Sequence, residues 1–307
     1  MSIYLGNNKV NAKTPNFASG TKYIWTDIDG EGAWNVSGYN LCSVDGAPIK
    51  DGHYRVWLTG VEAGMDYTAS FTSTLSATKS VIIDWGDGTI ETRTSSSSRS
   101  HTYQTAGNYV VEFQFADGSN VGLSSFPQTV RTSYVKYLEM SYGNSGYSST
   151  PSAIKDNKTL VKAYICDDIT VFGGYGFTGC SSLQSVRLSP AMISLTTYCF
   201  NDCTSLVSCP LHEGIQYILN GAFLNCVSLE KITLPSSLLA IRTSAFSGCT
   251  GLKEIHFLAT TPPTVDDSNA WTNLPTDCKI YVPTGTLTNY TSATNYPNPA
   301  TYTYVEE

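Results

Sequence analysis

Apolar residues recur along the middle of the chain with a constant period of 23 residues. Each copy has a phenylalanine, a cysteine three residues later and a leucine three residues after that. The four full copies contain Phe177 and Cys180, Phe200 and Cys203, Phe223 and Cys226, and Phe246 and Cys249. A degenerate copy with Ile154 and Leu160 lies one period upstream. A constant period of roughly 20 to 29 residues predicts a solenoid, which we place at residues 153–257.

Each copy continues with a short run in which apolar and polar positions alternate. After Leu229, for example, Ile232 and Leu234 are apolar and Thr233 between them is polar. The other copies of this run begin at Leu160, Leu183, Leu206 and Leu252. Alternation with period two predicts a strand with one buried face. Because one coil cannot bury its own apolar positions, we expect stacked coils with a parallel sheet along one side.

The period is lost after Phe257, and residues 258–307 are predicted to form a C-terminal cap and tail. Thr261–Pro263 ends the regular structure, since proline cannot donate a backbone hydrogen bond. Trp271 lies 25 residues after Phe246 and is expected to occupy the phenylalanine column of an altered last copy. The following segment, Asp277–Pro283, is expected to hold the terminal strand.

Upstream of the repeats, residues 53–135 predict a β-sandwich. The expected strands are 54–58, 66–72, 79–85, 89–94, 107–115 and 120–123. Short strands separated by turn signals are typical of a sandwich rather than of alternating strands and helices. Residues 136–152 are assigned to a hinge and N-terminal cap, although the alternation in Val135–Met140 also predicts the first strand of the solenoid.

Residues 1–52 are rich in glycine and asparagine and carry scattered aromatic residues. Lys22–Thr26 is expected to be a short strand. This segment is too small and polar to bury a good core alone, so we interpret it as an arm that docks on another surface. That surface is either the rest of this chain or a partner protein.

Composition and charge exclude several functions. Charged residues make up 14% of the chain, the net charge is −7, and no run of lysine and arginine occurs. This argues against nucleic-acid binding, which requires a basic surface. No apolar stretch approaches the length of a membrane span, so membrane insertion is not expected. The first ten residues, Met1–Val10, lack the pattern of a secretory signal peptide.

The cysteines predict packing rather than metal binding. The chain has nine, of which four recur once per coil, whereas zinc sites cluster their cysteines as Cys-x-x-Cys. We therefore expect a column of buried thiols, no metal and no cofactor. Disulfides between adjacent coils remain an alternative at this point.

The repeat read from Leu229 to Leu252 resembles the BspA-type leucine-rich repeat. That family is common in surface proteins of gut and oral bacteria and in their phages. The resemblance covers about a third of the chain and implies a solenoid used for binding or adhesion. It implies no catalytic residue.

A second resemblance lies in the sandwich. Ile82–Thr89, His101–Tyr103 and Gly107–Val111 together resemble the PKD-type immunoglobulin-like domain. The resemblance implies structural roles for six residues: Trp85, Asp87, Gly88, His101, Tyr103 and Tyr109. The alternatives are His101 as a catalytic base and a calcium ion held by Asp84 and Asp87. Two carboxylates are few for calcium, which takes six to eight oxygen ligands.

The expected fold is therefore mainly β, with an immunoglobulin-like sandwich followed by a leucine-rich-repeat solenoid. We find no nucleophile elbow, Walker-type loop or zinc-protease motif, and only four histidines, so we predict that the protein is not an enzyme. Solenoids of this kind usually bind through the exposed face of the strand ladder. The outward positions expected to form that face are Tyr164, Arg187, Thr233 and His256.

The first hypothesis is a phage virion protein, such as a fibre, decoration or tail-associated subunit, because adhesion modules occur here without a secretion signal. The arm would dock on other virion proteins, and the solenoid would contact a host surface protein or glycan. A bacterial cell-surface adhesin is the second hypothesis, and a purely structural virion subunit is the third. The sequence leaves homo-oligomer formation open.

Overall fold

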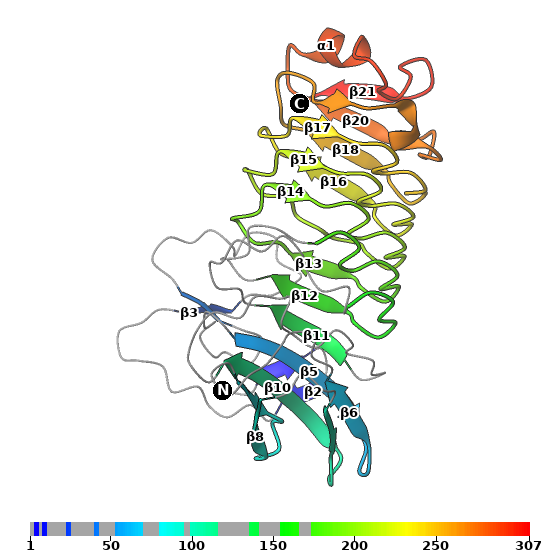
Figure 1. The fold of residues 1–307 in the computed structure, drawn as a ribbon. Coiled ribbons are helices and arrows are strands. Elements are labelled where there is room, and N and C mark those ends of the chain that lie inside the picture. The colour runs from blue at the N-terminus through cyan, green and yellow to red at the C-terminus, as the bar shows by residue number, and fades with distance from the viewer. Residues whose placement is uncertain are drawn as a thin grey trace.

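A computed structural model describes residues 3–5, 8–10, 23–25, 40–42, 53–69, 80–94, 99–115, 135–140, 154–165 and 173–307 of the 307-residue chain. Figure 1 shows a stack of coils that rises from a group of longer antiparallel strands. The architecture is mainly β, as predicted. Two helical segments occur in the described residues, η3 (Ser268–Trp271) and α1 (Leu287–Thr291), and neither is long and apolar enough to cross a membrane.

The N-terminal half contains an antiparallel sheet and three two-stranded pairs. The antiparallel strands are β5 (His53–Val61), β7 (Val81–Asp84), β8 (Ile90–Arg93) and β10 (Gly107–Phe115). The pairs are β6 (Asp66–Ala69) with β9 (Arg99–Thr102), β1 (Ile3–Leu5) with β2 (Asn8–Val10), and β3 (Tyr23–Trp25) with β4 (Asn40–Cys42). The short strand expected at Lys22–Thr26 is confirmed as β3. The strand expected at 120–123 lies outside the described residues.

A single sheet runs from these strands into the solenoid. Its order is β13-β12-β11-β5-β10-β7-β8, with β11 (Val135–Met140), β12 (Lys162–Ile165) and β13 (Ser185–Arg187). β11 is antiparallel to β5 on one edge and parallel to β12 on the other. The prediction that this segment is the first strand of the solenoid is confirmed. Residues 136–140 of the proposed hinge are thus hydrogen bonded on both sides, and residues 141–152 lie outside the described residues.

Beyond β13 the coils form two parallel sheets. One contains β14 (Ser194–Leu195), β15 (Tyr217–Ile218), β17 (Ala240–Ile241) and β19 (Thr264–Val265). The other contains β16 (Lys231–Leu234), β18 (Glu254–Phe257), β20 (Lys279–Val282) and β21 (Thr303–Glu306). Neighbouring strands pair at the repeat period, as where Lys231 lies opposite Glu254. The terminal strand expected within 277–283 is confirmed as β20, and β21 adds one more strand that the sequence pattern did not predict.

The strand ladder is interrupted in one coil. The run that begins at Leu206 was predicted to be a strand, but only an isolated bridge between Ser185 and Ser208 forms there. Pro210 explains the error, because it has no backbone N–H and cannot take part in a parallel ladder on both edges. The prediction of a strand at 206–211 is therefore wrong. As a result, the sheet that contains β13 and the sheet that begins at β16 are separate.

The phenylalanine column is confirmed as a continuous stack of rings in the core. The centroids of Phe177, Phe200, Phe223 and Phe246 are 5.6, 5.5 and 5.3 Å apart in succession. Trp271 continues the stack at 5.4 Å from Phe246 with an interplanar angle of 3°. The expectation that a tryptophan closes this column is also confirmed. Stacked rings of constant spacing explain why the period stays at 23 residues until the last coil.

The cysteine column forms a second ladder, in which each thiol contacts a backbone carbonyl of the preceding coil. Cys203, Cys226 and Cys249 donate to the carbonyl oxygens of Phe177, Phe200 and Phe223 at 3.1, 3.2 and 3.1 Å. Cys180 donates in the same way to Ile154 at 3.0 Å. Burial raises the pKa of the Cys180 and Cys249 thiols to about 12, so both stay protonated and can donate.

Each coil turns through residues in the left-handed backbone region. One such column contains Tyr175, Tyr198, Gly221 and Ser244, with φ of 66°, 55°, 59° and 58°. A side chain at Gly221 would have its Cβ 2.3 Å from the ring of Tyr198. Glycine is thus required there by both the backbone conformation and the ring that covers it. A second left-handed column lies four residues further along each coil and includes Gly179, Asp202, Asn225 and Gly248.

The cap closes the core with tyrosines that bury their rings and hydrogen bond through their hydroxyls. Tyr290 donates to the carbonyl of Ala259 at 2.6 Å, and Tyr296 donates to that of Pro263 at 2.8 Å. Both rings pack against Phe257, with centroids at 4.9 and 5.6 Å. These contacts close the C-terminal end of the solenoid core. Without them, this end would need a further coil to bury it.

Candidate binding face of the strand ladder

The four residues expected to form a binding face are divided between two sheets. Tyr164 on β12 is the register partner of Arg187 on β13, and Thr233 on β16 is the register partner of His256 on β18. The interruption at Pro210 separates the two pairs. They therefore do not lie in one continuous sheet, and only the second pair lies in the C-terminal sheet.

The expected exposure of Arg187 is wrong. All three residues of β13 are buried, which means that the strand is covered on both faces. The guanidinium of Arg187 donates from Nη1 to the carbonyl of Ile165 at 3.0 Å. The side chain of Tyr164 lies outside the described residues. This part of the ladder therefore provides no open face at β13.

The C-terminal sheet is covered on one side only. Its inward residues, Ile232, Leu234, Ile255, Phe257, Ile280 and Val282, are all buried in the solenoid core. We call the opposite side the ladder face, defined by Lys231, Thr233, Glu254, His256, Lys279 and Tyr281. The lysines are exposed, and Thr233, Glu254 and Tyr281 are half-buried. Strand alternation therefore gives this sheet a polar outer surface, as the pattern predicted.

His256 lies at the centre of the ladder face but is itself buried, so its expected exposure is also wrong. Nδ1 is 2.6 Å from Oε1 of Glu307, and Nε2 is 3.1 Å from Oε2 of Glu254. The ring is stacked on that of Tyr281, with centroids 4.2 Å apart. Neighbouring side chains thus cover a residue whose backbone position does point outward.

Charges on the ladder face are partly paired. Lys231 Nζ lies 3.3 Å from Glu254 Oε2. Hydrogen bonds from His256 and then from Lys231 hold the pKa of Glu254 below its ordinary value. Lys279 has no ion-pair partner among the described residues. The face therefore combines a polar network with the exposed ammonium group of Lys279 and the hydroxyl of Tyr281, groups suited to hydrogen bonding with a polar partner.

Sequence reasoning missed Glu254, Lys231, Lys279 and Tyr281 of this face, and also Glu307, which contacts His256. The outward position of Glu254 could have been predicted from the sequence, because Glu254 precedes Ile255 on the same alternating run. The residues of β20 pair with β18 at a step of 25 rather than 23, as where Lys279 lies opposite Glu254. A strict period therefore does not bring them into register. The contact of Glu307 with His256 joins positions 51 apart and has no sequence signal.

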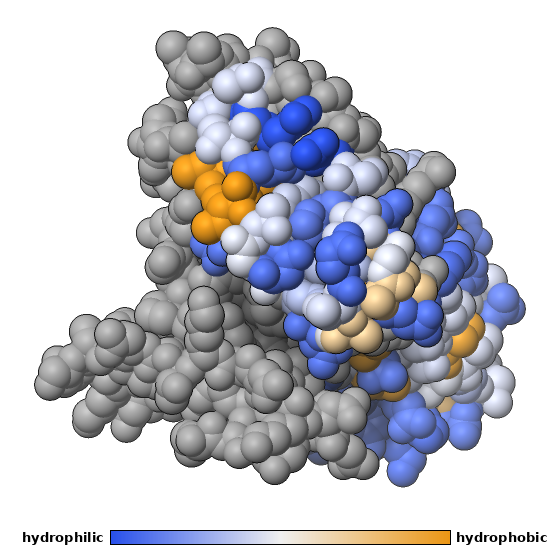
Figure 2. Space-filling view, turned by 90° about the horizontal axis from the view of Figure 1, so that it is seen from below, coloured by the Kyte–Doolittle hydropathy of each residue, from blue (hydrophilic) through white to orange (hydrophobic). Residues whose placement is uncertain are grey.

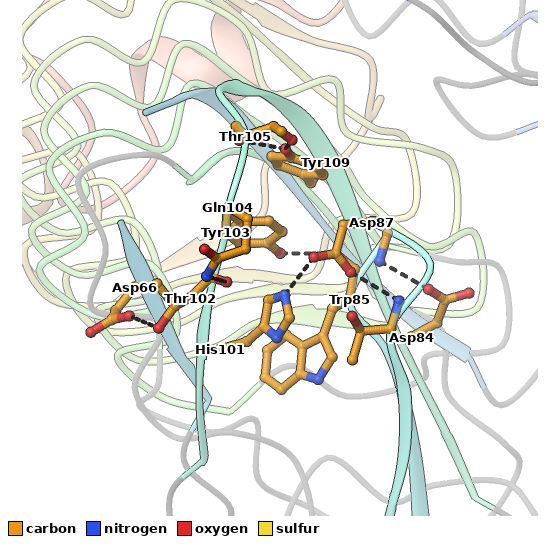
Figure 3. A network of polar contacts seen from close by, with 12 residues as sticks. Asp66, Asp84, Trp85, Asp87, His101, Thr102, Tyr103, Gln104, Thr105 and Tyr109 are labelled. Atoms are coloured by element: carbon orange, nitrogen blue, oxygen red, sulfur yellow. Dashed lines mark hydrogen bonds and ion pairs between the residues drawn. The ribbon is translucent and has the colours of Figure 1, made fainter. Parts of the chain in front are cut away.

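The residues that resemble the PKD motif form a packed cluster (Figure 3). The ring of His101 stacks on Trp85, with centroids 4.9 Å apart, and its Nε2 lies 2.7 Å from Oδ2 of Asp87. Tyr103 donates its hydroxyl to the carbonyl of Trp85 at 2.9 Å, and its ring stacks on Tyr109 at 4.0 Å. In these contacts the side chains of Trp85, His101, Tyr103 and Tyr109 pack on one another.

The loop between β7 and β8 uses both of its carboxylates internally. Asp84 Oδ1 accepts from the backbone of Gly86, and Asp87 Oδ1 accepts from that of Thr89, each at 2.9 Å. Burial would raise the pKa of Asp87, but the hydrogen bonds from Thr89 and His101 outweigh it and lower the pKa. Gly88 adopts φ of 97°, which a turn of this kind requires.

The cysteine side chains within the described residues are all free, buried thiols: Cys180, Cys199, Cys203, Cys209, Cys226, Cys249 and Cys278. The disulfide alternative is thus wrong for these seven. In the part of the chain that the structure describes, no three histidine, cysteine or acidic side chains are grouped so as to hold a metal ion.

The described residues on the surface seen from the end at which the long antiparallel strands lie are mostly hydrophilic (Figure 2). On this side, hydrophobic side chains among the described residues gather only in small separate patches. Exposed apolar residues on the solenoid, such as Ile193 and Leu239, are likewise scattered. Single exposed apolar residues of this kind are ordinary for a folded protein.

Residues 151–268 match the family described as BspA type leucine rich repeat region, in six copies. This part of the chain is therefore similar to BspA-type leucine-rich-repeat regions, in agreement with the resemblance noted from Leu229 to Leu252. The match begins near the predicted start of the solenoid at residue 153 and ends within the cap.

Three solved structures are similar to parts of this chain. A leucine rich cell surface protein from Faecalibacterium prausnitzii is 30% identical, with 43% of this chain and 34% of that chain covered and a TM-score of 0.38. A leucine-rich repeat protein from Bacteroides ovatus is 22% identical, with 56% and 43% covered and a TM-score of 0.45. The pneumococcal vaccine antigen PcpA is 16% identical, with 52% and 43% covered and a TM-score of 0.35.

The chain thus spans less than half the length of each of these three proteins. A comparison with curated proteins found no match.

Proposed function

We propose that the protein is a non-enzymatic adhesion protein of a bacterial surface, which binds a surface protein or glycan through the ladder face. The observation that carries this proposal is the one-sided burial of the C-terminal sheet. Its strands are fixed from behind by the core, while Lys279 and Tyr281 remain available in front. A rigid polar surface of this kind loses little conformational entropy when it binds a partner.

The cell surface is the favoured location because the repeats match a BspA-type region and because a protein 30% identical over its matched part is described as a cell surface protein. Location on a phage particle remains a second hypothesis, in which residues 1–52 dock on other virion proteins. Mass spectrometry separates the two. Peptides of this chain in washed bacterial envelopes support the first, and peptides in purified phage particles support the second.

The binding role is tested with a pair of matched variants. Thr233→Arg with Lys279→Gln changes the ladder face, and Ser194→Arg with Thr264→Glu changes the sheet of β14 and β19, with the net charge of the protein unchanged in both variants. Binding to immobilised mucin and to intact gut bacteria is measured with fluorescently labelled protein. We expect the first variant to bind at least about tenfold more weakly, as for loss of a central interface contact, and the second to bind as the wild type does.

Equal binding by the two variants would show that the ladder face is not the binding surface. Circular dichroism and melting curves of both variants serve as the control for folding. Because all four positions are exposed or half-buried, neither variant should lose more than about 1 kcal/mol of stability.

A further inference from the structure

His256 occupies an unusual position between two carboxylates that come from different parts of the chain. Glu254 precedes it on β18, and Glu307 follows the last strand, β21. The imidazole is stacked on Tyr281 with an interplanar angle of 3°, and its side chain is only 11% exposed. The ring is therefore held in one orientation, with one nitrogen facing each carboxylate.

The hydrogen bonds between His256 and the two carboxylates depend on how many protons the ring carries. An ionised carboxylate only accepts hydrogen bonds, and a neutral imidazole carries a single N–H. Both carboxylates can accept from His256 only when the ring is an imidazolium. When the ring loses its proton, one carboxylate faces a nitrogen lone pair. The number of hydrogen bonds here therefore changes with the protonation of the ring.

The charged and titratable groups around the ring are Lys231 on β16, Glu254 on β18, Lys279 and Tyr281 on β20, and Glu306 and Glu307 at the end of β21. Thr233, the register partner of His256, is uncharged. Glu254 is shared between His256 and Lys231 and keeps a cationic partner in either state of the ring. In the described part of the chain, Glu307 has His256 as its only ion-pair partner. Whichever nitrogen keeps the remaining proton, deprotonation leaves Glu307 without a cationic partner in the described part of the chain.

That contact connects the end of the ladder to its interior. Among the described strands, β21 pairs with β20 alone and is the last strand of the sheet. The backbone of Glu307 donates to Val282 at 3.0 Å and accepts from Thr284 at 3.1 Å, so the residue is anchored beside β20. Its side chain then reaches across to His256 on β18. The contact thus joins the end of β21 to a strand with which β21 does not pair.

We propose that His256 is a proton-dependent latch for β21. The imidazolium holds the end of the strand against the ladder, and the neutral imidazole loosens it. Loosening exposes the backbone edge of β20, where the N–H and C=O groups that now pair with β21 become available to another strand. This inference does not depend on the binding role of the ladder face.

Hydrogen–deuterium exchange of the full chain tests the latch. Exchange of the peptide 298–307 is measured between about pH 5.5 and pH 8, with rates corrected for the intrinsic effect of pH. We expect protection of β21 in the wild type to fall about tenfold over this range, as for the loss of one charge-assisted hydrogen bond. In His256→Gln, protection should be lower and independent of pH.

His212→Gln is the matched control, because Nδ1 of His212 contacts the carbonyl of Glu213 rather than a carboxylate. It should behave as the wild type does. Glu307→Gln provides a second test if His256→Gln fails to fold. An amide can donate to or accept from the ring in either protonation state, so this variant should keep β21 protected at both ends of the pH range.

Wild-type protection that does not change with pH would overturn the proposal. So would a pH dependence that persists unchanged in His256→Gln, since another group would then cause it.

Discussion

At the scale of single residues, the repeat is maintained by side chains that satisfy the backbone of the neighbouring coil. The cysteine ladder does this inside the core, where each thiol donates to a carbonyl that water cannot reach. Glu213 does it at the surface. Its carboxylate accepts from the backbone and hydroxyl of Ser236 and from the backbone of Ser237, at 3.0, 2.8 and 3.2 Å. Residues of this kind set which coil stacks on which.

Cys226→Ala should destabilise the protein by about 2–4 kcal/mol, from the buried carbonyl of Phe200 left without a donor and from the cavity. Cys278→Ala is the matched control. That thiol is equally buried, but its contact with a carbonyl, Lys279 O, is long at 3.9 Å. Urea denaturation of the two variants measures the difference. Equal losses would mean that the thiol acts by volume alone.

Gly221→Ala should cost about 1–2 kcal/mol for the left-handed backbone, plus the energy needed to move the ring of Tyr198. Gly285→Ala is the control, because Gly285 also has a positive φ of 82° but no atom within 4 Å of an added Cβ. Thermal melts should place the first variant below the second. If Tyr198→Ala combined with Gly221→Ala restores no stability, the ring is not the obstacle.

Glu213 predicts a pH dependence with a definite sign. Burial would raise its pKa from the ordinary value of 4.5, but the hydrogen bonds from Ser236 and Ser237 outweigh it and lower the pKa. A lowered pKa stabilises the fold above the unfolded-state value, and this stabilisation is lost as the pH falls through the folded-state value. The stability difference between wild type and Glu213→Gln should therefore shrink below about pH 4.5.

The difference is measured by urea denaturation between about pH 3 and pH 7, and it should be small because Glu213 is exposed. A difference that stays constant or grows toward low pH would show that the carboxylate does not act through its charge.

At the scale of elements, the sequence predicted the features that recur in every coil. The phenylalanine and cysteine columns and the paired strands β16 and β18 follow from one period, because each of these coils meets the same environment. The predictions were wrong at positions whose surroundings differ from one coil to the next. Pro210 interrupts the strand ladder. This interruption could have been predicted from the sequence, since proline is rare inside parallel strands.

The burial of Arg187 and His256 could not be predicted in the same way. Each position alternates outward along its strand, as the pattern indicated, and is nevertheless buried. For His256 the covering residue Glu307 lies 51 positions away. Candidate residues of the ladder face could therefore be placed on a strand from the sequence, but their exposure required the tertiary structure.

At the scale of the whole molecule, the seven-stranded sheet makes the solenoid continuous with the strands before it. β11 carries this connection, because it pairs with β5 and β12 on opposite edges. The two parts are thus connected by backbone hydrogen bonds and not only by the chain. A force on the solenoid would pass into the antiparallel strands, which suits a protein that holds a partner.

The shared sheet predicts that β5, β11 and β12 unfold together. Calorimetry of the wild type should show a single main transition, and Leu138→Pro, which removes a backbone donor from β11, should lower its midpoint or divide it in two. Two well-separated transitions in the wild type would contradict the coupling.

The claim that the ladder face binds a surface partner is tested most directly by hydroxyl-radical footprinting of the full chain with and without gut mucin. Tyr281 on the ladder face and Tyr217 on β15 are both half-buried, so they form a matched pair. We predict that mucin lowers the oxidation of Tyr281 and leaves that of Tyr217 unchanged. Protection of Tyr217 without protection of Tyr281 would contradict the account and move the binding surface to the other sheet.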